Sequence, residues 1–221
     1  MTMFKLEKKF VFQIGAHIRP AQLRKKIRAL RKNNEGIAAV EFALLSPVMI
    51  ALYFGLVEIS MIIHSDKITS HAANVAGDLA TQVSNMDSDD IEDVFEATLA
   101  TMALRPEQAD GVSMEVLSYR MLPDNSIEQI GIATLNGGYV GTAYDPNDIG
   151  TRLLTPTSGA VVARVQYNYE SVTYKFVEAF TLLEETFILK PRSSADIPFS
   201  LDGTPGSFIC TSSGSYSVTC S

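Results

Sequence analysis

Residues 37–63 read IAAVEFALLSPVMIALYFGLVEISMII, and this stretch decides the architecture of the chain. As a helix it extends about 40 Å at 1.5 Å per residue, which exceeds the roughly 30 Å of hydrocarbon in a bilayer. It is longer than the apolar core of a secretory signal peptide and lacks an Ala-x-Ala cleavage site. We therefore expect a retained transmembrane helix. A buried core helix is the alternative that apolar composition alone leaves open.

The charges on the two sides of this stretch differ in sign. Residues 1–36 contain ten Lys or Arg and two acidic residues, 10 − 2 = +8, so the rest of a chain whose total is −7 carries −7 − 8 = −15. A basic block on one side of an apolar helix stays in the cytoplasm under the positive-inside bias. This predicts a cytoplasmic tail over residues 1–36 and an extracytoplasmic domain over residues 64–221.

The basic tail has a helical pattern of its own. Between Arg19 and Lys32, the apolar residues Leu23, Ile27 and Leu30 fall on one helical face among basic side chains. Interfacial membrane helices have this pattern, so we expect contact with membrane lipids. A solvated orienting tail is the main alternative. We expect no nucleic-acid partner, because these residues are tethered beside a bilayer.

Two carboxylates interrupt the apolar stretch. Glu58 falls about 32 Å along the helix from Ile37, where we expect water or headgroups at the outer interface. Glu41 lies only about 6 Å past Ile37, which is too deep for free solvation, so it needs a positive partner. A cut between Gly36 and Ile37 would supply one, since a terminal amine is largely protonated at neutral pH.

The residues around Glu41 resemble a known family. Gly36-Ile-Ala-Ala-Val-Glu41-Phe42, after basic residues and before an apolar run, is similar to a prepilin processing site. In that pattern glycine precedes the cut, and a glutamate and an aromatic residue are fifth and sixth after it. The stretch EGIAAVEFALLSPVM from Glu35, with Gly55-Leu-Val-Glu58 further on, resembles the TadE-like pseudopilins of the tight-adherence (Tad/Flp) pilus system.

This resemblance implies a function. A membrane prepilin peptidase would cut after Gly36 and leave Ile37 as the mature terminus, with Glu41 and Phe42 serving in processing and assembly. The chain would be a non-catalytic minor pilin or pseudopilin in the bacterial inner membrane or the pilus. Its partners would be other pilin subunits and the Tad assembly machinery. The alternatives are an uncleaved signal-anchored protein with a partner-binding outer domain, and a membrane-tethered hydrolase using outer carboxylates.

The remainder of the chain predicts an α+β domain. Apolar residues at three- and four-residue steps continue the first helix as a stalk through residues 65–85, and a second helix is expected over residues 89–102. Alternating residues then indicate a hairpin of residues 112–116 and 127–134, and strands near residues 160–169 and 186–190. Together these give a long helix, a small helix and a small antiparallel sheet, as the resemblance to pilins also implies.

The outer domain shows little sign of chemistry. Common catalytic signatures and phosphate-binding loops are absent from the sequence, so we expect no enzyme and no cofactor. His64 and His71 share a helical face without a known ligand spacing, and the calcium-like start at Asp145 lacks its later ligands, so we expect no metal site. Cys210 and Cys220 are the only cysteines, and an extracytoplasmic location predicts a disulfide between them.

Overall fold

A computed structural model describes residues 36–104, 106–150, 153–170, 182–201, 204–213 and 216–221. It divides into two compact units, Met1–Tyr53 and Phe54–Ser221, which are described separately. The basic tail with its expected interfacial helix lies outside the described residues.

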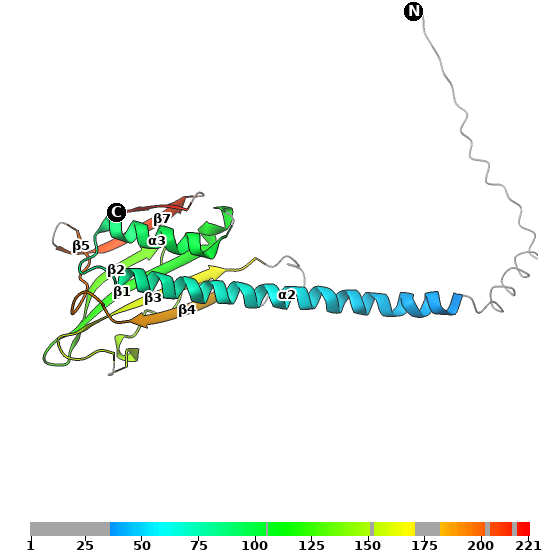
Figure 1. Ribbon diagram of the computed structural model, residues 1–221, viewed down its shortest axis with the longest axis horizontal. Coiled ribbons are helices and arrows are strands. Elements are labelled where there is room, and N and C mark those ends of the chain that lie inside the picture. The colour runs from blue at the N-terminus through cyan, green and yellow to red at the C-terminus, as the bar shows by residue number, and fades with distance from the viewer. Residues whose placement is uncertain (1–35, 105, 151–152, 171–181, 202–203, 214–215) are drawn as a thin grey trace, which may run out of the picture. The chain divides into compact units, whose positions relative to one another are not determined.

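The first described helix, α2, extends over Ile37–Ala80 and is unbroken (Figure 1). This confirms the prediction of an apolar helix that continues into a helical stalk, although the helix ends at Ala80 and not at residue 85. Pro47 lies inside α2 without ending it. Side chains from residue 37 to residue 56 are exposed apart from a half-buried Ser46. One face becomes buried further on, and its buried members are Glu58, Thr69, Ala72, Ala73, Ala76, Gly77 and Ala80.

The second helix, α3, extends over Ser88–Met102, one residue longer than predicted. A reciprocal capping box starts it: Asp90 N–H donates to the Asp87 carboxylate at 2.9 Å, and Asp87 N–H donates to the Asp90 carboxylate at 3.3 Å. Its buried residues recur at three- and four-residue steps, which gives α3 one apolar face.

A six-stranded sheet packs against both helices, in the order β4-β3-β1-β2-β7-β8. Its strands are β1 (Val112–Met121), β2 (Ile127–Leu135), β3 (Gly159–Asn168), β4 (Leu182–Leu189), β7 (Ser207–Ser213) and β8 (Ser217–Cys220). The short strands β5 (Ser200–Leu201) and β6 (Thr204–Pro205) pair separately, and two 3-10 helices are η2 (Pro106–Gly111) and η3 (Pro146–Asp148).

The predicted hairpin and the two later strands are therefore confirmed, but the sheet is larger than expected. The Ser-rich C-terminal end adds β7 and β8. Strand β7 pairs with β2 in parallel, with Thr134 opposite Ile209, so the sheet is mixed and not wholly antiparallel.

Each face of the sheet has its own core, because successive side chains of a strand point to opposite faces. Val161 and Val165 of β3 join the core beneath α2 and α3, and Ala160 and Val162 face the other way. The loop between β2 and β3 covers that second face through Ile149 and Leu154.

Candidate processing and assembly site

The predicted cleavage site lies where α2 begins. Gly36 immediately precedes the first helical residue, Ile37, and both are exposed. A Cβ built on Gly36 would have no atom within 4 Å, so the surrounding structure does not require a glycine there. The side chains of Glu41 and Phe42 are exposed one turn further along, with Phe42 at 69%.

The segment that begins at Ile37 presents apolar side chains around the whole circumference of α2. No residue is buried in its most apolar 18-residue window, and by length and composition it is the one described helix able to cross a membrane. A soluble domain would bury such a helix in its core. The exposed segment therefore fits a single-pass membrane protein.

Glu58 corrects one expectation from the sequence. We predicted a solvated carboxylate at the outer interface, but the residue is only 1% exposed. The hydroxyl of Tyr169 donates a hydrogen bond to Glu58 Oε1 at 3.3 Å. Burial, followed by the charge of Glu58, raises the pKa of Tyr169, so the phenol remains a donor at neutral pH. No local pattern indicated this contact, because 111 residues separate the two partners.

Strand β4 lies beside the second half of α2. A Cβ built on Gly77 would overlap the Leu189 side chain, so glycine permits the close approach of helix and strand here. Further back along both elements, burial and then the charge of Asp66 raise the pKa of Glu185. Arg192, just after β4, pairs with Asp78 of α2.

A buried polar cluster fastens the loop between β2 and β3 to the sheet. Arg164 pairs with Glu115 at 3.0 Å and stacks on the Tyr139 ring at 3.3 Å from its centroid. The side-chain amide of Gln166 accepts from Val140 N–H at 2.6 Å and donates to Val140 C=O at 2.8 Å. These contacts order the loop and satisfy groups that the sheet would otherwise bury unpaired.

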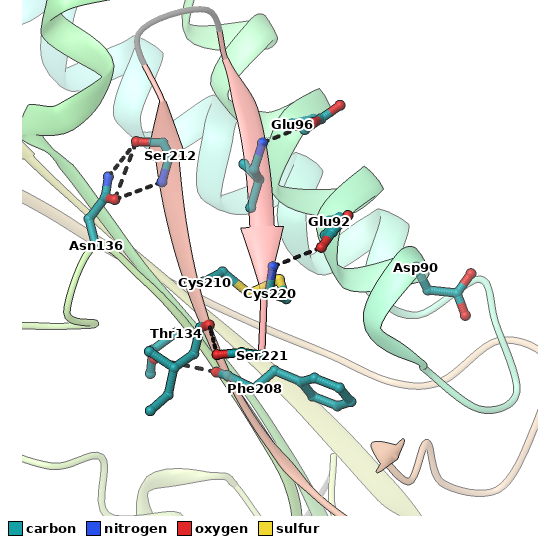
Figure 2. The surroundings of a disulfide bond; sticks show 12 residues. Asp90, Glu92, Glu96, Thr134, Asn136, Phe208, Cys210, Ser212, Cys220 and Ser221 are labelled. Carbon is teal, nitrogen blue, oxygen red and sulfur yellow. Dashed lines mark hydrogen bonds between the residues drawn. A yellow bond between two sulfur atoms is a disulfide. The ribbon is translucent and has the colours of Figure 1, made fainter. Parts of the chain in front are cut away.

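The predicted disulfide between Cys210 and Cys220 is present and joins β7 to β8 (Figure 2). The two cysteines are directly opposite each other in the antiparallel pair, with Cα atoms 4.1 Å apart. Two carboxylates of α3 reach the other side of β8: Glu96 accepts from Val218 N–H at 2.9 Å and Glu92 accepts from Cys220 N–H at 2.7 Å. Two acidic side chains of α3 thus bind the last strand.

The remaining candidate ligands do not come together. Among the residues that the structure describes, no three His, Cys, Asp or Glu side chains form a group able to hold a metal ion. His64 and His71 are exposed on α2. Asp145 caps η3 by accepting from Asn147 N–H at 2.9 Å.

Comparison with known proteins supports the resemblance seen in the sequence. Residues 36–78 match the family model described as TadE-like protein. The match begins at the predicted cleavage glycine and ends within the part of α2 that packs on the sheet. No curated protein and no solved structure matches the chain.

Proposed function

Because the chain is TadE-like over residues 36–78, we propose that it is a minor pilin or pseudopilin of a Tad/Flp pilus assembly system. In this proposal it is a non-catalytic subunit and a substrate of a prepilin peptidase. The basic tail stays in the cytoplasm, α2 spans the inner membrane, and the sheet domain lies in the periplasm. Other pilin subunits and the Tad machinery are its partners.

One observation carries the proposal: an exposed glycine with no packing role stands at the start of an exposed apolar helix. Hydrolysis of the Gly36–Ile37 bond would leave a carboxylate on Gly36 and an ammonium group on Ile37. That ammonium, from this chain or a neighbour, would lie about one helical turn from Glu41 and offset its charge. A neutralised Glu41 lowers the cost of keeping the carboxylate at membrane depth.

The test is the intact mass and amino-terminal sequence of the membrane-extracted protein, from cells with and without the prepilin peptidase. We expect a mature chain that begins at Ile37 only when the peptidase is present. Gly36→Ala should abolish this product, because the enzyme needs a residue without a side chain before the cut.

Gly55→Ala is the matched control. It makes the same chemical change inside α2, away from the predicted cut, and a Cβ on Gly55 likewise has no atom within 4 Å. This variant should be processed normally. If residues 1–36 stay attached under every condition, processing is refuted and a permanently anchored binding protein becomes the better description.

Co-isolation tests the assembly role. The processed chain should purify with sheared pili or with other Tad subunits from solubilised membranes, and Gly36→Ala should remain in the membrane fraction alone. If the processed chain and Gly36→Ala were recovered equally with the pilus, assembly would not depend on processing. The proposed link between the two would then be refuted.

A further inference from the structure

The C-terminal strands expose side chains on the outer face of the sheet, which is the face opposite α2 and α3. Phe208 and Cys210 of β7 belong to the core beneath the helices, so Ile209 between them points to the outer face. Ile209 is 60% exposed, and the half-buried Thr134 of β2 is opposite it. Further along β7, an exposed threonine is opposite an exposed threonine of β8. We call this area the open face, and its residues are Thr134, Ile209, Thr211 and Thr219.

The open face is uncharged, although the chain around it is acidic. Residues 132–135, 207–213 and 217–220 form the three strands of this area, and they contain no charged side chain. The chain after residue 36 has a net charge of −7 − 8 = −15. Residues 87–96, in and just before α3, hold six carboxylates and no basic side chain, and α3 packs on the opposite face of the sheet (Figure 1). Two copies that met through their helices would bring these carboxylates together, whereas two open faces would not.

The thickness of the layers separates the acidic helices when two open faces meet. Packed sheets lie about 10 Å apart, and a helix adds a layer about 10 Å thick on the far side of each sheet. The α3 helices of two copies would then be on the order of 30 Å apart, several times the Debye length of about 8 Å at physiological salt. Salt screens repulsion over that distance. Two copies of this acidic chain can therefore meet through the open face at little electrostatic cost.

The side chains of the open face can pair with their own counterparts in a second copy. A hydroxyl group both donates and accepts a hydrogen bond, so Thr211 and Thr219 can bond to threonines of the second chain. An ionised carboxylate only accepts and could not pair with itself. Ile209 supplies an apolar centre, and contact with a second Ile209 would remove both side chains from water. An interface between two identical faces has two-fold symmetry.

The loop between β2 and β3 determines the direction of the two-fold axis. Through Ile149 and Leu154 it covers the neighbouring part of the outer face, over β1 and β3, so it stands above the sheet beside the open face. An axis across the strands would bring the loops of the two copies against each other. An axis along the strands, passing over β7, places β8 of one copy over β2 of the other. Each loop then lies beyond the β8 edge of the other copy, and the sheets pack with aligned strands, as in β-sandwiches.

We propose that the open face binds the open face of a second copy of this chain, in a two-fold dimer centred on Ile209. The contact area consists of three strands about 4.8 Å apart and the length of β7, which is on the order of 300 Å² per copy. A standard stable interface buries roughly 800 Å² per partner, so this dimer is weak and forms at the high local concentration of a membrane. The inference goes beyond the proposed function and does not depend on cleavage at Gly36.

Opposite charges at position 209 test whether the partner is a second copy. The full-length chain, with the photocrosslinker p-benzoyl-phenylalanine at position 211, would be reconstituted in phosphatidylcholine vesicles and irradiated. With Ile209 intact, we expect a crosslinked dimer of 2 × 24.1 = 48.2 kDa. Ile209→Asp alone and Ile209→Lys alone should each lower the dimer yield at least about tenfold, because like charges would meet across the axis. An equal mixture of the two variants should restore the dimer, because opposite charges then face each other.

Val140→Asp is the matched control. Val140 is 70% exposed, and its backbone bonds to Gln166 of β3, away from the open face, so the dimer yield should not change. Intact mass, which reports the disulfide between Cys210 and Cys220, checks that β7 and β8 form in every variant. Absence of the dimer with Ile209 intact would overturn the proposal, and so would a mixture of the two charged variants that does not restore it. Neither result would bear on cleavage at Gly36, which has its own test.

Discussion

Reduction of the disulfide should release the last strand of the sheet while leaving its centre intact. Cys210 and Cys220 are ten residues apart and close a small loop. When β8 opens in the oxidised chain, its far end stays tethered to β7. The tether lowers the conformational entropy of the open state. For a loop of this length, this raises the free energy of the open state by about 2.7 kcal/mol.

The measurement is hydrogen exchange by mass spectrometry on the full chain in detergent, with and without a thiol reductant. A change of about 2.7 kcal/mol corresponds to about 100-fold faster exchange of the β8 amides after reduction. Peptides from β3, which pairs with a strand on both sides, should exchange at the same rate in both samples. They serve as the internal control.

Unchanged protection of β8 after reduction would refute this reasoning. In that case the hydrogen bonds from Val218 and Cys220 to the α3 carboxylates, together with the pairing to β7, would hold the strand without the crosslink. The disulfide would then add nothing to the local stability of the sheet edge.

Two further predictions concern buried groups of the sheet, and both use exchange of the β3 amides as the measure of unfolding free energy. Arg164→Met should destabilise the domain by about 3 kcal/mol, because it leaves the carboxylate of Glu115, 15% exposed, without its ion pair. Arg192→Met, whose side chain is 61% exposed, should cost less than about 1 kcal/mol, and equal losses would contradict the role of burial. Burial, followed by the charge of Glu115, raises the pKa of Tyr119 to about 12 from an ordinary 10.0. The folded state therefore binds this proton more tightly than the unfolded state, so stability should be full below pH 10 and fall between pH 10 and pH 12. Tyr119→Phe should reduce that fall, and an unchanged pH profile would refute the assignment.

Local patterns in the sequence predicted those helices and strands in which buried residues recur at a regular spacing. The helical spacing of Ile68, Ala72, Val75, Leu79 and Val83 predicted the stalk. Alternation at Val112, Met114 and Val116 predicted β1. Strands β7 and β8 were not predicted, because serine and threonine occupy most of their exposed positions. The parallel pairing of β7 with β2 depends on a crossover that local patterns do not encode.

Some residues of the candidate site could likewise be predicted from the sequence, and others could not. Gly36, Glu41 and Phe42 lie within one short segment, so the resemblance to a prepilin processing site could identify them from the sequence. Burial of Glu58 depends on Tyr169, and the contacts of Glu92 and Glu96 depend on a strand more than a hundred residues later. A carboxylate that accepts from a distant backbone N–H looks the same in sequence as one that faces water.

The carboxylates on the outer side of β8 also affect whether this edge of the sheet can pair with a second molecule. Proteins held in a membrane meet at high local density, and an exposed strand at a sheet edge is a template for pairing with another molecule. Two of the outward N–H groups of β8 already donate to glutamates of the same chain. An incoming strand would have to displace a charged acceptor for each hydrogen bond that it formed, so this edge should resist self-association even where many copies wait side by side.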